Sequence, residues 1–167
     1  MDIKEDINDI NLSFINKYKD KQLEEEDINK IIKYYLKILT NDNNYETSFE
    51  SYYHIESSTI SIEEYLKRLI ELLDISQNLI IISLIYIDRL KIKFNYNNFH
   101  KLLLTSLLIT NKFLEDDNIT NNYWANYGGI PLDYLNKLEI KFLKKINYIL
   151  YVNEEEFIKK YEEIFLV

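Results

Sequence analysis

The chain has 167 residues and a mass of 20.3 kDa, which suits one domain built around one core. Its 47% hydrophobic and 29% charged residues are ordinary for a globular protein, but two glycines are too few for the turns of a β-sandwich, a β-barrel or a phosphate-binding loop. The absence of cysteine excludes disulfides, thiol nucleophiles and thiolate zinc sites. A net charge of -8 argues against a surface for nucleic acid or anionic membrane.

No segment of the sequence has the pattern of a targeting or membrane-spanning element. Residues 1–6 are acidic and lack the apolar stretch of a signal peptide. The longest apolar run, Leu79 to Ile87, is too short to cross a bilayer and ends in Asp88 and Arg89. We therefore expect an intracellular protein of the cytoplasm, the nucleus or both, in which the glycosylation sequon at 118–120 is a coincidence.

Helical periodicity predicts the elements of the N-terminal half better than composition does, because Ile, Asn, Lys and Tyr are used heavily throughout. Residues 1–20 show weak helical spacing and are expected to form a weak helix or a mobile lead-in. A strong amphipathic helix is predicted from Leu23 to Leu39, followed by a long loop over 41–58 that suits a functional surface. Ser61 and Glu64 then form a capping box that opens another helix.

The C-terminal half reads as helices as well, and the fold class is therefore all-α, with five consecutive helices between Ser61 and Ile146. A buried strand is the alternative for the Ile-rich run 79–87, but the length of the apolar segment favours a helix. The elements expected are a helix from Ser76 to about Ile92, a turn over 95–98, a helix over 99–114, a short helix over 120–127 closed by Gly128 and Gly129, a helix through Leu135 to Ile146 that Pro131 precedes, and a last helix capped by Asn153. The helix over 99–114 is apolar almost all round, which predicts a place in the middle of a bundle.

Candidate catalytic and metal-binding residues are few. His54 and His100 lie far apart in the sequence and no carboxylates accompany them in an obvious catalytic set, so both are expected to be structural or exposed. The acidic run 115–118 suggests a calcium loop, but the glycine of such a loop is missing and Tyr127 stands where its last glutamate belongs, so a solvated loop is the better interpretation. Paired carboxylates for glycosidase chemistry stay open without a motif that supports them. We predict no catalytic residue, no cofactor and no metal.

Three charged residues stand inside or beside very apolar helices. Asp88 follows the run 79–87, Lys112 comes three residues after the apolar run 107–109, and Glu139 lies beside Leu138. Buried or half-buried charges need partners. One interpretation is an ion pair within the protein, and the other is that Lys112 and Glu139 are held at a surface to meet the backbone of another protein.

These segments resemble the cyclin box, in particular that of the P/U-type, phosphate-regulon-like cyclins. The resemblance covers about two thirds of the chain and depends on an ordered set of motifs that is specific only as a set. The motifs are Ser61-Ile62-Glu63-Glu64-Tyr65-Leu66-Lys67-Arg68, Tyr86-Ile87-Asp88-Arg89, His100-Lys101-Leu102-Leu103-Leu104-Thr105-Ser106, Asn111-Lys112-Phe113-Leu114-Glu115-Asp116, Tyr123-Trp124-Ala125 with Gly128-Gly129-Ile130, and Leu135-Asn136-Lys137-Leu138-Glu139.

The resemblance implies a single five-helix cyclin-box domain over 58–167, with its central helix at 99–114, a C-terminal helix, and an N-terminal helical extension and loop over 1–57. It also implies a non-catalytic subunit that binds and activates a cyclin-dependent protein kinase, as in the control of the cell cycle. In the family, the residues that match Lys112 and Glu139 hydrogen-bond the kinase around its mobile αC helix. The apolar partners of that helix would be Phe113, Leu143, Tyr148 and Leu150.

Asp88 matches the structural aspartate of the family, whose arginine partner has no counterpart here. We therefore expect Asp88 to use Arg68 or Arg89, or backbone N–H groups. The substrate-docking patch of cell-cycle cyclins is not recognisable near 58–65, and a second cyclin repeat is not expected before Val167. Two other functions stay open: a cyclin-like scaffold or adaptor that activates no kinase, and a helical interaction domain with no kinase partner. A net charge of -8 disfavours a DNA-binding adaptor.

Overall fold

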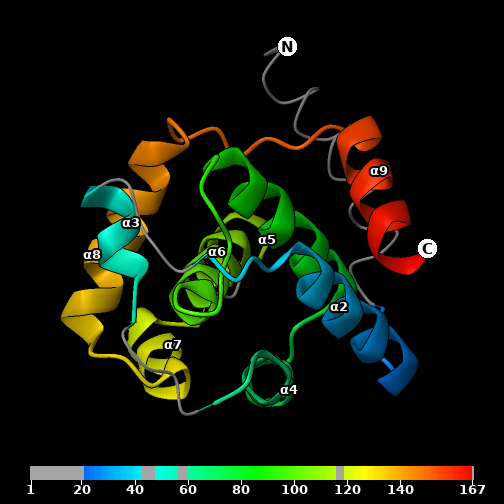
Figure 1. The fold of residues 1–167 in the computed structure, drawn as a ribbon, viewed down its shortest axis with the longest axis horizontal. Coiled ribbons are helices and arrows are strands. Elements are labelled where there is room, and N and C mark those ends of the chain that lie inside the picture. The colour runs from blue at the N-terminus through cyan, green and yellow to red at the C-terminus, as the bar shows by residue number, and fades with distance from the viewer. Residues whose placement is uncertain (1–20, 43–47, 56–59, 116–118, 167) are drawn as a thin grey trace.

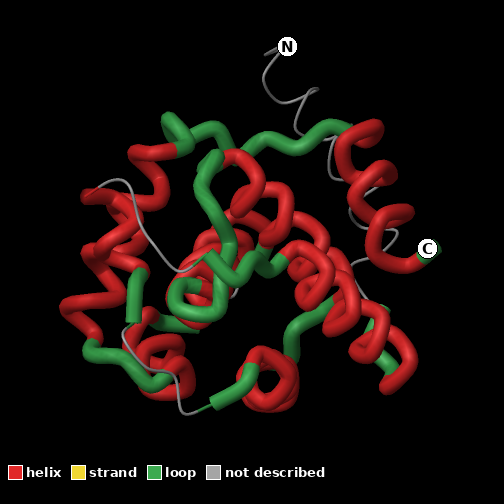
Figure 2. The backbone as a smooth tube through the Cα atoms, in the orientation of Figure 1, coloured by secondary structure: helices red, strands yellow, loops and turns green. Residues whose placement is uncertain are grey.

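Helices carry most of the residues placed in the computed structural model, which describes 21–42, 48–55, 60–115 and 119–166 (Figure 2). Within these ranges no strand forms, and a single β-bridge joins Thr40 to Asn95. The predictions for residues 1–20, for the acidic run 116–118 and for the sequon at Asn118 lie outside the described residues. The helices are α2 (Glu25–Ile38), α3 (Ser48–Tyr53), α4 (Ile62–Leu73), α5 (Gln77–Arg89), α6 (Phe99–Leu114), α7 (Asn121–Gly128), α8 (Leu132–Lys145) and α9 (Glu154–Phe165).

Helix α6 lies at the centre of the bundle and contacts α3, α4, α5, α7 and α8 (Figure 1). Leu104 and Leu108 on α6 are fully buried, because the helix has neighbours on every side. The predicted all-α fold, with five helices from α4 to α8 and a central apolar helix, is confirmed. The strand alternative for 79–87 is wrong, since this run is the buried body of helix α5.

Local signals set the helix ends. The Glu64 N–H donates to Ser61 Oγ at 3.1 Å, and the Glu64 carboxylate accepts from the Ser61 N–H, so the predicted capping box opens α4. Gly129 ends α7 in the left-handed region with φ 72°, where a residue without a Cβ is unstrained. Gly128 lets α7 approach α6, because a Cβ there would lie 2.2 Å from a side-chain carbon of Leu104.

Helix α3 corrects the prediction of one long loop over 41–58. Its last residue, Tyr53, is fully buried and donates its hydroxyl hydrogen to the Leu138 carbonyl of α8 at 2.7 Å. Six residues are too few to show helical periodicity, so packing against α6 and α8 is what identifies this element. The N-terminal part of the chain therefore covers the bundle at two places: α3 lies on α8, and α2 lies between α4 and α9.

Helix α9 packs against α2 and α5 at the opposite side of the bundle from α8 (Figure 1). Its N-cap is the predicted Asn153, whose side-chain oxygen accepts from the Glu156 N–H at 2.8 Å. None of the helices placed in the structure is both long and apolar enough to cross a membrane.

Candidate functional site

Lys112 and Glu139 meet where the end of α6 crosses the middle of α8. Lys112 Nζ lies 2.7 Å from Glu139 Oε1, so the two residues singled out in the sequence form an ion pair. The side chains are 37% and 14% exposed, respectively. The carboxylate is thus held inside the rim of the bundle, and the ammonium group reaches it from the solvent side. The interpretation as an ion pair within the protein is confirmed, and contact with another protein stays a prediction.

Asn121 is the third member of this cluster, and it was not predicted from the sequence. Its Nδ2 donates to Glu139 Oε2 at 2.8 Å and to Asn136 Oδ1 at 2.8 Å. It is the first residue of α7, so one amide ties the start of α7 to the middle of α8. Asparagine is frequent throughout this chain, and nothing local distinguishes Asn121 from the others. Both oxygens of Glu139 are therefore bonded, which fixes the carboxylate.

Exposed apolar side chains surround the ion pair. Phe113 is 50% exposed and Tyr148 is 59% exposed, while Leu143 is half-buried one helical turn beyond Glu139. The Tyr148 N–H donates to the Leu143 carbonyl at 2.8 Å, which brings the two residues together. We call Lys112, Phe113, Glu139, Leu143 and Tyr148 the α6–α8 surface.

The sixth predicted residue of the site lies farther along the chain. Leu150 is half-buried, and its carbonyl accepts from the Tyr86 hydroxyl at 2.7 Å. Three more exposed apolar residues between the middle of α8 and the start of α9 were not predicted. They are Ile140, Ile149 and Tyr151, exposed by 51%, 55% and 48%. Single isoleucines and tyrosines are too common in this sequence for exposure to be predicted from residue type.

The turn after α8 places Tyr148 in an unusual backbone conformation. Asn147 and Tyr148 have φ angles of 54° and 56°, in the left-handed region. Asparagine tolerates this region, but a bulky residue such as tyrosine adopts it at a cost of about 1 kcal/mol or more. The hydrogen bond from the Tyr148 N–H to the Leu143 carbonyl holds the backbone of this turn, and the Tyr148 side chain is exposed.

Asp88 pairs with Lys160 of α9, at 2.6 Å, which corrects the expected partners Arg68 and Arg89. Lys160 Nζ also binds Glu163 at 2.7 Å and the Tyr34 hydroxyl at 2.9 Å, so it joins α2, α5 and α9. Burial alone lowers the pKa of Lys160, but its hydrogen bonds to Asp88, Glu163 and Tyr34 outweigh burial and raise the pKa above the usual value. The partner was missed because α5 and α9 are distant in sequence and only packing brings them together.

Arg89 donates hydrogen bonds to other groups than Asp88. Its guanidinium donates to the carbonyls of Ile149 and Tyr151, each at 2.8 Å, and to the Glu156 carboxylate at 2.9 Å. It thus fastens the segment that follows Tyr148 to the end of α5. Arg68 is exposed on α4 and does not pair with Asp88.

His100 holds the start of α6 to the segment before α4. His100 Nε2 donates to the Ile60 carbonyl at 3.0 Å, and its ring stacks on Phe99 and meets the edge of Tyr65. Burial lowers the pKa of His100, because the charged form loses solvation. In the described ranges, no three His, Asp or Glu side chains gather as a metal site would require.

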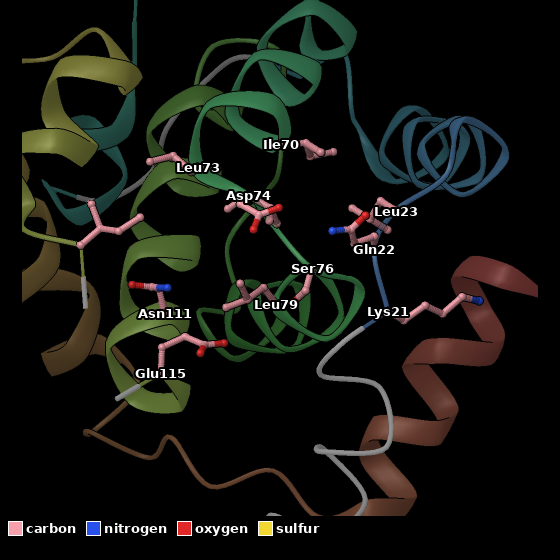
Figure 3. A pocket seen from close by; sticks show the side chains of 12 residues that line it. Lys21, Gln22, Leu23, Ile70, Leu73, Asp74, Ser76, Leu79, Asn111 and Glu115 are labelled. Atoms are coloured by element: carbon pink, nitrogen blue, oxygen red, sulfur yellow. The ribbon is translucent and has the colours of Figure 1, made fainter. Parts of the chain in front are cut away.

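A hollow of about 630 Å³ lies beside the end of α6, between the end of α4, the start of α5 and the segment 21–23 (Figure 3). Its lining includes Asn111 of α6, Glu115 directly after α6, and Asp74, Ser76 and Lys21. Lys112 and Glu139 do not line it. The hollow and the α6–α8 surface are therefore separate features at one end of the same helix.

Comparison with known proteins adds independent information. Residues 6–150 match the family model described as Cyclin. Cyclin-U4-3 of Arabidopsis thaliana is 36% identical over 124 residues, which cover 71% of this chain and 57% of the relative. Cyclin-P4-1 of Oryza sativa subsp. japonica is 36% identical over 103 residues, covering 59% of this chain and 49% of the relative.

A fungal relative is similar over the same length. PHO85 cyclin-like protein psl1 of Schizosaccharomyces pombe is 32% identical over 104 residues, covering 59% of this chain and 43% of the relative. The chain spans about half the length of the curated relatives it matches.

Proposed function

Because the chain belongs to the cyclin family and its relatives are cyclins of the P and U types, we propose that it binds and activates a cyclin-dependent protein kinase. It would do so as a regulatory subunit that catalyses no reaction, in the cytoplasm or the nucleus. The printed name of the fission-yeast relative refers to PHO85 cyclins, which supports a kinase partner of that kind.

The observation that carries this proposal is the placement of a fixed ion pair among exposed apolar side chains on the α6–α8 surface. Lys112 and Glu139 are bonded to each other, yet Lys112 keeps more than a third of its side chain in solvent. Phe113 and Tyr148 beside them are at least half exposed. A centre of apolar area with a few oriented polar groups is typical of a protein-binding surface.

The mechanism would be a shift in the populations of the kinase. A kinase of this class holds its αC helix in two arrangements, and only the inward one forms the Lys–Glu pair that aligns the phosphates. A subunit that contacts only that arrangement stabilises it by the difference in affinity between the two. Phe113, Leu143, Tyr148 and Leu150 would supply apolar contact, and Lys112 and Glu139 would fix the register on backbone groups near αC.

Contacts within the protein already order the α6–α8 surface in the absence of a kinase. Asn121 fixes the Glu139 carboxylate, and Arg89 fastens the segment after Tyr148 through two carbonyls. Tyr148 is exposed and has a backbone conformation that costs free energy, a feature that gathers at functional sites. Side chains that are already ordered lose less entropy when a partner binds.

The test is a titration of each purified cyclin-dependent kinase of the source organism with the chain, following both binding and phosphorylation of a substrate. Lys112→Ala and Glu139→Ala should each weaken binding about tenfold or more, because hydrogen bonds to charged groups contribute roughly 1.5–3 kcal/mol. Both should abolish stimulated activity while the helical circular dichroism stays unchanged.

A matched control removes an exposed ion pair elsewhere. Lys67 and Glu63 of α4 lie 3.0 Å apart and are about half exposed, so Lys67→Ala should leave binding and activation as they are. Intact binding and activation by a folded Lys112→Ala/Glu139→Ala double variant would contradict the assignment of this surface. Binding without activation by the unaltered chain would instead favour a scaffold or adaptor.

A further inference from the structure

One side of α8 carries a stripe of lysines that the kinase proposal does not use. Lys137, Lys141, Lys144 and Lys145 are spaced by four, three and one residues, which places them along one side of the helix. Glu139 and Leu143 of the α6–α8 surface lie on another side of α8. A partner that covers the α6–α8 surface would therefore leave the lysine stripe open.

Lys101 of α6 joins the stripe from the neighbouring helix. Its Nζ lies 3.0 Å from the Tyr134 hydroxyl and 4.5 Å from the centre of the Tyr134 ring. Lys141 Nζ lies 3.7 Å from the centre of the Tyr52 ring on α3, and Tyr134 donates its hydroxyl hydrogen to the Tyr52 carbonyl. These contacts converge, so the ammonium groups of α6 and α8 and the aromatic rings of α3 and α8 form one surface.

The charge of this surface is not neutralised by the part of the chain that the structure describes. In the described ranges, ion pairs join other lysines to carboxylates, such as Lys30 to Glu26 and Lys67 to Glu63, but none of them involves these five lysines. Aromatic rings and carbonyls orient an ammonium group without cancelling its charge. Asp133 lies one helical turn before Lys137 on the same side of α8, so the surface holds five lysines beside this carboxylate in a protein with a net charge of -8.

We propose that the surface formed by Lys101, Lys137, Lys141, Lys144 and Lys145 is a docking site for an Asp/Glu-rich segment of a partner protein. Charge complementarity favours this occupant, because cations left unpaired by the fold gain free energy from an acidic partner and draw it in at long range. A nucleic acid fits less well, because the rings of Tyr134 and Tyr52 already contact the ammonium groups of Lys101 and Lys141, whereas nucleic-acid grooves use aromatic rings to stack on bases.

The test is fluorescence anisotropy with the full chain and a fluorescein-labelled peptide of repeated Asp-Glu-Ser. The variant Lys137→Glu/Lys144→Glu changes two exposed side chains that hold no other element in place. The control, Lys33→Glu/Lys37→Glu on α2, makes the same change in net charge at two exposed lysines elsewhere. We expect binding that weakens as salt is added, a loss of about tenfold or more in the first variant, and a loss of about twofold or less in the control.

Other outcomes would overturn the proposal. Equal losses in the two variants would show a nonspecific effect of net charge, and an unchanged affinity in the first variant would place the peptide elsewhere. Tighter binding of a labelled single-stranded oligonucleotide, lost in the same variant, would replace the acidic protein with a nucleic acid. Circular dichroism of both variants checks that each is folded, and the assay needs no kinase, so its failure leaves the proposed function standing.

Discussion

The ion-pair clusters around Lys160 and around Lys112 use similar groups in different surroundings. Lys160 is 10% exposed and lies between three helices, with Asp88, Glu163 and Tyr34 as partners. Lys112 is 37% exposed at the rim of the bundle, beside the half-exposed Phe113. Removing a buried cation leaves its partners unpaired and destabilises the fold, whereas removing an exposed one changes stability little. We therefore distinguish the structural cluster, formed by Lys160 with Asp88, Glu163 and Tyr34, from the candidate binding surface by how deeply its lysine is buried.

A substitution in the core of α6 should cause the largest loss of stability. Its size is the reference against which substitutions in the two clusters are compared. Leu108→Ala should lower the free energy of unfolding by roughly 2–5 kcal/mol, because it removes buried methyl groups and leaves a cavity. Urea denaturation followed by circular dichroism measures the change. A loss below about 1 kcal/mol would mean that the centre of the bundle is loosely packed.

Lys160→Ala should have the next largest effect, about 1–3 kcal/mol, since it leaves Asp88, Glu163 and the Tyr34 hydroxyl without a shared partner. Lys159→Ala is the matched control, because Lys159 is the exposed neighbour on the same helix. Thermal melts of the two variants decide the point, and equal melting temperatures would break the distinction between the clusters.

Asp88→Ala should destabilise less, by about 1 kcal/mol, which corresponds to a few degrees in melting temperature. The Asp88 side chain is 51% exposed, and without the Asp88 carboxylate Lys160 still bonds to Glu163 and Tyr34. An unchanged melting temperature together with lost kinase binding would move Asp88 from the structural cluster to the binding surface.

Lys112→Ala should cost less than about 1 kcal/mol of stability, because exposed ion pairs contribute little. Since the two residues bond each other, Lys112→Ala/Glu139→Ala should lose less kinase affinity than the sum of the single variants. A stability loss as large as that of Lys160→Ala would make Lys112 a structural residue and remove the contrast.

Replacing His100 should have the smallest effect on the free energy of unfolding, and the effect should be measurable only at acidic pH. Its pKa is lowered in the folded protein, so the unfolded chain takes up the proton first as pH falls below about 6.5. The stability contributed by the neutral ring is thus complete above that pH and is lost between it and the lower pKa of the folded state. Urea midpoints of the chain and of His100→Gln across this range measure the difference, and parallel curves would contradict it.

Much of the fold could be predicted because its signals are local. The capping box at Ser61, the stop at Gly129 and the spacing of apolar residues in α2, α4 and α9 each lie within a few residues of one another. Helix α3 could not be predicted, because its six residues are held by the burial of Tyr53 against α8 and α6. A pattern in the sequence shows which secondary structure a segment prefers. It does not show which packing neighbour will stabilise a helix in a segment without that preference.

The sequence by itself determined the described helices other than α3, the central place of α6 and, through an ordered set of motifs, the family to which the chain belongs. The tertiary structure alone decided that Asp88 meets Lys160, that Asn121 holds Glu139, and that Ile140, Ile149 and Tyr151 are exposed. The physical reason is distance along the chain. Helix caps and periodicity depend on groups a few residues apart, whereas an ion pair or an exposed face depends on which helices pack together, and that choice is made by the whole core at once.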